Sequence, residues 1–415
     1  MAGAAPILPY GRQAIDEDDI AAVAAVLRSD WLTTGPATRA FESALAERCD
    51  AAHAVSCANG TAALHLACLA MGLGTGHTVI VPTMTFAATA NAPRLVGAEV
   101  VFADVDPDSG LMRAAHFRDA IRRTTASGRH ASAVFPVDLA GQCDDLEEIA
   151  QLAHHEDMVV IEDACHAIGA QYRHHDAAWQ RIGCSRDSDM TIFSFHPVKT
   201  IACGEGGAVL TQRADLNERL TLFRGHGIHR NAAAFVDTEA GFDRASVNPW
   251  YYEMVELGLN YRLSDVNCAL GLSQLKKLDH FVASRRQLAD HYDALLAPLA
   301  PAVRPIARSP WCHPAWHLYS VLIDFDGLRK SRGQVARELE EHGIRSQVHY
   351  IPVHRQPYYR ARYGDQKLPG AEAYYQRTLS LPLFVGMSAD DVGRVVEALA
   401  TTLGIGAAAS RRARR

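Results

Sequence analysis

The chain has 415 residues, of which 48% are hydrophobic and 21% are charged, and its formal net charge is −6. This composition is that of an ordinary globular protein of more than one domain, and the negative balance gives no surface suited to nucleic acid. The nine cysteines include no Cys-x-x-Cys pair, so neither a zinc site nor a disulfide framework is indicated. Because we find neither the pattern of a secretory signal nor an apolar run of membrane-spanning length, we expect a cytoplasmic protein with no membrane partner.

The first half of the chain alternates short apolar strands with segments suited to helices. Asp16 can cap a first helix, in which Ile20, Val23 and Leu27 form an apolar stripe. Predicted strands cover residues 53–57, 78–81, 100–105, 131–137 and 158–161, and helix-compatible segments separate most of them. Such alternation is typical of an α/β fold with a mostly parallel sheet covered by helices on both faces.

Polar or aromatic residues follow several of these strands where each one ends. They are Asn59, Phe86, Asp138, Asp163 and Ser194. Because ligands of such sheets bind beyond the carboxyl ends of the strands, these five segments are expected to converge on one site. The turn at Asn59 joins a strand to a helix and could aim backbone N–H groups at an anion, although such turns are often mere connections. Asp163 is equally suited to a functional role and to capping a helix.

A lysine lies between two apolar strands in residues 189–207. Residues 190–195 predict a strand, Pro197 ends it, and Gly206 and Gly207 allow the chain to enter a second strand at residues 208–210. Burial at this position lowers the pKa of Lys199, and a neutral amine can form a Schiff base with a carbonyl compound. Most lysines in loops are simply solvated, so the surrounding motifs have to decide between the two interpretations.

The second half predicts a smaller α+β domain. Ser264 should open one long helix that continues through Val282, followed by a strand at residues 316–324 and a helix at 334–342 that ends at Gly343. A further strand is predicted at 344–350 and a closing helix at 391–403. We therefore expect a large domain over residues 1–259, a smaller domain over 260–403 and a disordered, Arg-rich tail over 404–415.

Six motifs, taken in their order and spacing, resemble a known family. They are Asn59-Gly-Thr-Ala-Ala-Leu-His, Pro82-Thr-Met-Thr-Phe, Glu162-Asp-Ala-Cys-His, Ser194-Phe-His-Pro-Val-Lys, Gly204-Glu-Gly-Gly and Gly258-Leu-Asn-Tyr-Arg-Leu-Ser-Asp. The chain is similar over nearly its whole length to the DegT/DnrJ/EryC1/StrS family of sugar aminotransferases, which depend on pyridoxal 5'-phosphate (PLP). The resemblance implies the fold type I architecture, with a mostly parallel seven-stranded sheet in the large domain.

The same resemblance implies roles for individual residues. Lys199 would form the Schiff base with the cofactor and then move protons as a general base, and Asp163 would pair with the ring nitrogen. The remaining implied contacts are Gly60, Thr61, Ala62 and Ser194 to the phosphate, Phe86 against the ring, His166 near the 3-oxygen, and Asn260 to the phosphate bound by the neighbouring subunit. The implied assembly is a homodimer with shared active sites.

Within the family, residues 195–199, 272–279 and 347–359 are most similar to the branch that acts in pseudaminic acid biosynthesis. This similarity implies transfer of an amino group from glutamate to C4 of UDP-4-keto-6-deoxy-N-acetyl-L-altrosamine. His196, Tyr350 and His354 are candidate sugar contacts, and core packing of the aromatic cluster around Tyr350 is the less favoured alternative.

Three alternatives remain. The first is an aminotransferase for another nucleotide-linked keto sugar, such as a dTDP-linked 3- or 4-keto sugar. The second is a PLP-dependent sugar dehydratase, but that branch of the family replaces the lysine by histidine. The third is a non-catalytic regulator on the same fold, which would be expected to have lost Lys199 or Asp163, and both are present.

Overall fold

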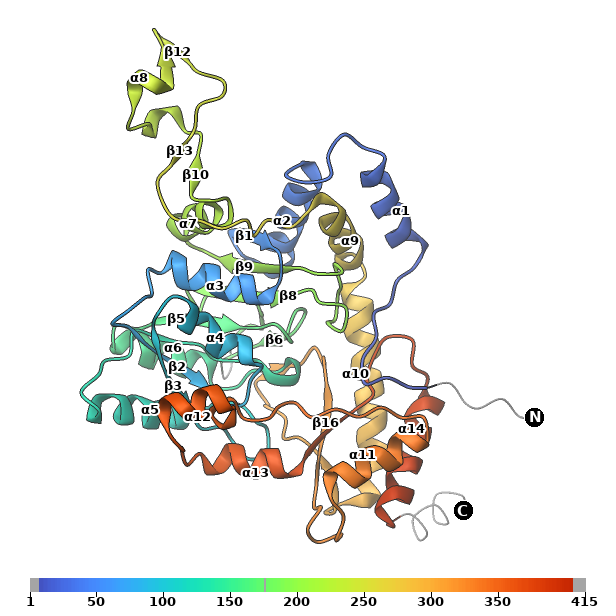
Figure 1. Ribbon diagram of the computed structural model, residues 1–415. Coiled ribbons are helices and arrows are strands. Elements are labelled where there is room, and N and C mark those ends of the chain that lie inside the picture. The colour runs from blue at the N-terminus through green and yellow to red at the C-terminus, as the bar shows by residue number, and fades with distance from the viewer. Residues whose placement is uncertain (1–6, 175–176, 406–415) are drawn as a thin grey trace.

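A seven-stranded sheet forms the centre of the computed structural model, which describes residues 7–174 and 177–405 (Figure 1). The strand order is β1–β9–β8–β5–β4–β2–β3. Only β9 runs against the other six strands, because it pairs antiparallel with both β1 and β8 while the remaining pairs are parallel. The strands are β1 (His53–Cys57), β2 (Thr78–Pro82), β3 (Glu99–Ala103), β4 (Ala133–Val134), β5 (Val159–Asp163), β8 (Met190–Ser194) and β9 (Gly207–Thr211). The predicted α/β fold with a mostly parallel sheet is confirmed.

Helices cover the sheet, as the continuous burial of β2 requires: Val79, Ile80 and Val81 are all fully buried although successive side chains point to opposite faces. The helix starts are specified locally. Asn59 caps α3 by accepting a hydrogen bond from the Ala62 N–H. The helices of this half are α1 (Glu17–Leu27), α2 (Pro36–Cys49), α3 (Gly60–Ala70), α4 (Ala87–Leu95), α5 (Ala114–Ala126), α6 (Leu146–His155) and α7 (Ala214–Arg224).

The first helix presents a different face to the protein from the one predicted. Asp16 caps α1 as expected, but Ile20 and Leu27 are 52% and 59% exposed. The residue that is fully buried is Asp19, which accepts a hydrogen bond from Gln274 and pairs with Lys277 at 2.8 Å. Because these partners satisfy the buried Asp19 carboxylate, α1 packs with this face inward and leaves the apolar stripe exposed.

The single long helix predicted from Ser264 is two helices. Ser264 caps α9 (Asp265–Leu275), and a second helix, α10 (Leu278–Leu296), follows after a short break. Lys277 lies in that break, and its amine pairs with Asp16 and Asp19. The helical spacing of apolar residues continues across the break, which is why the sequence pattern alone does not reveal it.

The C-terminal part contains a second, three-stranded sheet of order β14–β16–β17, made of β14 (Val303–Pro305), β16 (Tyr319–Ile323) and β17 (Thr378–Leu381). The strand predicted at 344–350 is wrong, since this segment makes only isolated bridges, Ile344 to Leu8 and Gln347 to Ser380. Gly404 ends the last helix in a left-handed conformation, and the Ile405 N–H bonds to Ala400, so these two residues of the predicted tail belong to the ordered end of that helix. Residues 406–415 of that tail lie outside the described residues. The helices here are α11 (Arg332–Glu341), α12 (Pro357–Tyr363), α13 (Pro369–Arg377) and α14 (Ala389–Leu403).

An arm formed by residues 228–254 projects from the body of the molecule (Figure 1). It carries the short strands β10 (Ile228–His229), β11 (Phe242–Asp243), β12 (Ser246–Val247) and β13 (Glu253–Met254) and the short helix α8 (Thr238–Gly241). Three further short strands, β6 (Gln171–Tyr172), β7 (Gln180–Arg181) and β15 (Cys312–His313), form a separate small sheet. Within the described residues, no helix is both long and apolar enough to cross a membrane.

Candidate active site

A cavity of about 690 Å³ lies at the carboxyl ends of the central strands. Four of the five predicted strand-end residues line it: Asn59 after β1, Phe86 after β2, Asp163 at the end of β5 and Ser194 at the end of β8. Lys199 reaches the same cavity from the loop between β8 and β9. The fifth residue, Asp138, is not part of the lining; its side chain is buried beside Glu162.

Asp163 is 6% exposed and has a defined set of donors. Its Oδ2 accepts a hydrogen bond of 2.6 Å from the Thr89 hydroxyl, and its Oδ1 accepts one of 3.2 Å from the Cys165 N–H. Each oxygen therefore has one protein donor and capacity for another that approaches from the cavity. Residues 164–170 form turns rather than a helix, so the capping interpretation of Asp163 is not supported.

Lys199 is half-buried, and the backbone of its loop is fixed by a hydrogen bond of 2.8 Å from the Lys199 N–H to the His196 carbonyl. Burial lowers the pKa of the Lys199 amine, and the neighbouring Cys165 and Asp163 side chains partly oppose that shift. The amine is therefore closer to its neutral, nucleophilic form than that of a solvated lysine.

The N-terminus of α3 points into the cavity through Gly60 and Thr61. A Cβ on Gly60 would lie 3.0 Å from Cβ of Ser194, so a glycine is needed for the helix to approach β8 this closely. The N–H of Ala62 is bonded at 2.9 Å to Oδ1 of Asn59, and Ala62 does not line the cavity, so the phosphate contact predicted for it is not supported. The positive end of this helix and the adjacent Ser194 hydroxyl suit an anion.

Three histidines that line the cavity are held neutral. The Ala140 N–H donates to Nδ1 of His166 at 3.3 Å, so the ring proton is on Nε2 and is donated to the Tyr350 hydroxyl at 3.1 Å. Burial, and then the Lys199 charge, place the pKa of His166 well below its usual range. The ring of His317 lies 4.4 Å from that of His166, and burial lowers its pKa in the same way, while His349 has a pKa lowered to about 3.

The structure places two of the three predicted sugar contacts at the cavity and the third outside it. His196 and Tyr350 line the cavity, and the Tyr350 ring lies 6.0 Å from that of Phe86, which is 59% exposed. His354 is buried outside the cavity, where Nδ1 bonds to the Thr83 hydroxyl at 2.7 Å and Nε2 lies 3.4 Å from Glu372. These partners correct the prediction for His354, because both of its ring nitrogens are already engaged.

Asn260 lies outside the cavity of its own chain. It is exposed and forms an isolated bridge with Gly225, near the base of the arm. The sequence pattern did not single out Thr89, His317 and His349, because each becomes a site residue only through tertiary contacts. Their only sequence signal is proximity to a motif, as for His349, which directly precedes Tyr350.

The donor set of the cavity fits PLP. The cofactor is an aromatic aldehyde with a ring nitrogen and a phosphate, and the cavity brings together a lysine amine, a buried carboxylate, a helix N-terminus and a hydroxyl. The carboxylate has capacity for one more donor, as a protonated ring nitrogen requires. Among the described residues, no group of three or more potential ligands could hold a metal ion.

Comparisons with known proteins agree with this geometry. The model of the DegT/DnrJ/EryC1/StrS aminotransferase family matches residues 13–400. An uncharacterized protein of Methanocaldococcus jannaschii, MJ1066, is 36% identical over 94% of this chain and 96% of its own length. Helicobacter pylori PseC, an aminotransferase involved in the biosynthesis of pseudaminic acid, has a TM-score of 0.85 and 27% identity, over 96% of this chain and 99% of its own. The putative sugar aminotransferase Spr1654 of Streptococcus pneumoniae, in its PLP form, has a TM-score of 0.84 and 27% identity over the same shares.

Proposed function

The chain belongs to the DegT/DnrJ/EryC1/StrS aminotransferase family, and we propose that it transfers the amino group of glutamate to C4 of a nucleotide-linked 4-keto-6-deoxy sugar. It is a PLP-dependent sugar aminotransferase, in keeping with structural neighbours solved in both the PLP and the pyridoxamine phosphate form. The observation that carries the assignment is the convergence of Lys199, Asp163 and the N-terminus of α3 on one cavity.

The bound cofactor supplies an electron sink for the substrate carbanion. In the proposed division of work, Lys199 Nζ would hold the cofactor at its aldehyde and, when free, would move a proton to and from the reacting substrate carbon. Asp163 holds a proton on the ring nitrogen through its free acceptor capacity, and Thr89 orients the carboxylate. The lowered pKa of Lys199 suits both of its tasks, because the amine has to be unprotonated to attack and to accept a proton.

The phosphate and ring contacts follow the cavity lining. Gly60, Thr61 and Ser194 would bind the phosphate, and Phe86 would lie against the ring. His166 would face the 3-oxygen edge of the ring as a neutral imidazole. Because His166 Nε2 already donates to Tyr350, the Tyr350 hydroxyl hydrogen remains available to a group in the cavity.

For the sugar, the proposed substrate is UDP-4-keto-6-deoxy-N-acetyl-L-altrosamine of the pseudaminic acid pathway. Support comes from the similarity to PseC and from residues 347–350, which line the cavity and belong to the segment that resembles the pseudaminic branch. His196 and Tyr350 are the proposed contacts, since both place polar atoms and rings at the cavity.

We further propose a homodimer in which each chain completes the site of its partner. Several large apolar side chains are exposed on the single chain, among them Trp31, Trp250 and Leu257, the last two being 72% and 83% exposed. Five of the exposed large apolar side chains fall within residues 250–257, and such a concentration in one segment is typical of a protein interface: Trp250, Tyr252, Met254, Val255 and Leu257. In this arrangement Asn260, which lies outside its own cavity, would contact the phosphate bound by the other chain.

The test is a substrate panel analysed by mass spectrometry. The purified enzyme with PLP and L-glutamate is incubated with UDP-linked and dTDP-linked keto sugars, and the expected result is an amino product from the UDP-linked 4-keto N-acetyl sugar. Amination of a dTDP-linked 3-keto sugar alone would replace the proposed substrate while leaving the aminotransferase activity intact. Loss of water from the sugar without incorporation of nitrogen would indicate a dehydratase instead.

A further inference from the structure

Two buried carboxyl groups lie directly behind the active-site aspartate. Glu162 precedes Asp163 in β5, so its side chain points to the opposite face of the sheet, and Asp138 lies on the neighbouring chain segment that follows β4. Each of these side chains is 2% exposed. The backbone ties the two segments together, because the Asp138 N–H donates to the Asp163 carbonyl at 3.1 Å.

The hydrogen bonds of this pair require a proton between the two groups. Oε2 of Glu162 accepts from the Thr191 hydroxyl at 2.7 Å and from the Ser188 hydroxyl at 3.3 Å. Oε1 of Glu162 and Oδ2 of Asp138 are buried and have no hydrogen-bond partner among the described residues. The two carboxyl groups lie close enough to shift each other's pKa, and because ionised carboxylates only accept hydrogen bonds, a proton on one of the two is what gives both oxygens a partner.

The surroundings favour retention of that proton. Burial raises the pKa of both groups, and mutual repulsion raises that of Asp138 further. The titratable groups that face the pair are neutral or anionic: Asp163, Asp187, Cys143, Cys184, Cys312 and Tyr172. An unprotonated pair would place two negative charges in contact without a counter-ion.

Asp138 also begins the turn that holds the histidines of the cavity. The turn is η1 (Leu139–Gly141), and Ala140 within it has a left-handed φ of 62°. The Ala140 N–H donates to Nδ1 of His166, and the Ala140 carbonyl accepts from the His317 N–H at 3.0 Å. A non-glycine residue in this conformation is retained only where its surroundings fix it. The position of both rings therefore depends on how firmly the turn is anchored.

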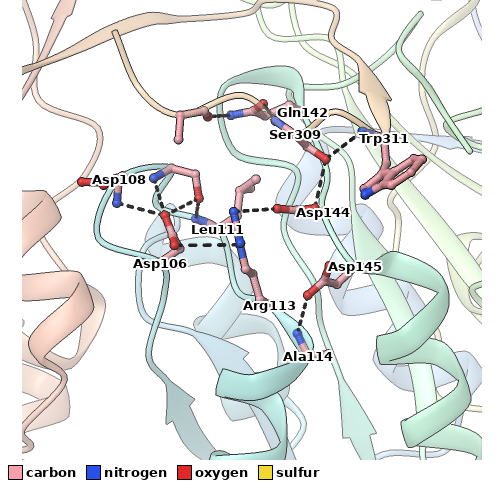
Figure 2. Close-up of polar contacts among 12 residues, drawn as sticks. Asp106, Asp108, Leu111, Arg113, Ala114, Gln142, Asp144, Asp145, Ser309 and Trp311 are labelled. Carbon is pink, nitrogen blue, oxygen red and sulfur yellow. Dashed lines mark hydrogen bonds and ion pairs between the residues drawn. The ribbon is translucent and has the colours of Figure 1, made fainter. Parts of the chain in front are cut away.

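The residues that follow the turn, Gln142 and Asp144, are held by a separate set of contacts, shown in Figure 2. Gln142 donates to the Ala307 carbonyl at 2.9 Å and accepts from the Ser309 N–H at 3.2 Å. Asp144 accepts from the Ser309 hydroxyl at 2.9 Å and pairs with Arg113 at 3.1 Å. At the start of the turn, the corresponding side chain is that of Asp138, which lies buried beside Glu162.

We propose that Asp138 is a positioning residue for the aminotransferase reaction, and that the proton it shares with Glu162 anchors the turn that places His166 and His317. The inference rests on the aminotransferase activity and not on the identity of the sugar. Loss of the shared proton at high pH separates the two carboxylates and releases the turn, so activity falls on the alkaline side without a change in the catalytic groups themselves.

The experiment compares Asp138→Asn with Asp138→Val. An asparagine amide can replace the acid proton as donor to Glu162, whereas valine leaves a buried carboxylate without that donor. We expect Asp138→Asn to keep kcat within about threefold of the wild type, and Asp138→Val to lose about tenfold or more in kcat with KM for L-glutamate little changed. Asp157→Asn, the same change at an exposed carboxylate shortly before β5, is the control and should leave kcat and its alkaline limb unchanged.

A second measurement needs neither cofactor nor substrate. Between the pH at which an ordinary carboxyl ionises and neutral pH, the folded pair holds a proton that the unfolded chain has lost, so the contribution of this pair to the free energy of unfolding falls as pH rises. Asp138→Asn should remove this contribution, and urea unfolding at several pH values should show a slope against pH that is more positive than that of the wild type by the equivalent of about one proton. This readout still decides about the shared proton if Asp138→Val does not fold.

Two results would overturn the proposal. One is an Asp138→Asn variant that folds but is as inactive as Asp138→Val, and the other is an unfolding slope identical to that of the wild type. If the wild type failed to react with L-glutamate, the proposed donor would be wrong, and the same comparison would be made with the amino acid that the wild type does accept.

Discussion

The Thr89 hydroxyl donates a hydrogen bond of 2.6 Å to Oδ2 of Asp163, which links α4 to the end of β5 across 74 residues of sequence. The Thr89 hydroxyl also lies 2.7 Å from the Thr85 hydroxyl. Because the Thr89 proton is used in the bond to Asp163, the Thr85 hydroxyl is the donor in this second bond. The two threonines thus fix the orientation of the carboxylate on the side away from Cys165. A carboxylate held in this way can meet a ring nitrogen without reorganisation.

Removal of the Thr89 hydroxyl should therefore weaken catalysis more than folding. We expect Thr89→Val to lower kcat by roughly 10- to 100-fold, because hydrogen bonds to charged groups contribute about 1.5–3 kcal/mol. Thr89→Ser retains the hydroxyl and should stay close to the wild type. Steady-state kinetics and thermal melting of both variants provide the measurement, and equal kinetics for valine and serine would contradict the assigned role.

Lys199 should be the point of covalent attachment of the cofactor. Reduction of the holoenzyme with sodium borohydride should add the mass of reduced PLP to the peptide that contains Lys199, and Lys199→Ala should show no such adduct and no measurable turnover. Lys276→Ala changes a lysine at the end of α9 and serves as the control. Full turnover of Lys199→Ala would refute the assignment.

The gathering of candidate site residues at one cavity was predictable, because most of them lie at the ends of strands. A run of apolar residues followed by Asn59, Asp163 or Ser194 is visible in one sequence, and the topology of parallel sheets brings such ends together. Asp138 shows the limit of this rule. It also follows a strand, but its side chain turns away from the cavity toward Glu162, and the direction of a side chain after the last paired residue is not encoded by the strand pattern.

The features that were not predicted from the sequence are determined by contacts between residues far apart in the chain. The exposed stripe of α1 results from the burial of Asp19 against Gln274 and Lys277, more than 250 residues away in sequence. Residues 344–350 have the composition of a strand, yet their partners are single residues on two different segments. His354 likewise belongs to the segment 347–359 that resembles the pseudaminic acid branch, but Thr83 and Glu372 engage both of its ring nitrogens.

Acid should destabilise the protein through its buried neutral histidines. His349 has a pKa of about 3 in the folded protein, lowered first by burial and then by the Lys199 charge, against an ordinary value of about 6.5 in the unfolded chain. Above pH 6.5 both states are neutral and His349 contributes nothing to the pH dependence. As pH falls from about 6.5 toward 3, only the unfolded chain gains the proton, so stability falls by up to about 1.4 kcal/mol per pH unit from this residue.

Urea unfolding between pH 7 and pH 5 measures this effect. His349→Asn retains a polar atom near Ser380, to which Nδ1 of His349 is bonded at 2.9 Å, and removes the titration. The slope of its unfolding free energy against pH should be smaller than that of the wild type, and the difference should correspond to at most one proton. An unchanged slope would mean that the pKa of His349 is not lowered in the folded protein.

The proposed sharing of active sites between two chains can be tested by mixing subunits. Lys199→Ala and Asn260→Ala should each be inactive or nearly so, the first because the amine is missing, the second because the partner's cofactor loses a phosphate contact. In a mixed dimer, one of the two sites combines an intact Lys199 from one chain with an intact Asn260 from the other. Random association gives mixed dimers in about half of the population, so up to about a quarter of wild-type activity should return.

The control is a mixture of Lys199→Ala with Asp163→Ala. Both residues line the cavity of their own chain, so mixing them should not create an intact site, and activity should stay at the level of the separate variants. Sedimentation of the same samples establishes the oligomeric state. Recovery in both mixtures would indicate exchange of larger segments between chains. An active monomer would refute shared sites, because Asn260 is exposed outside its own cavity and could not contact the phosphate within a single chain.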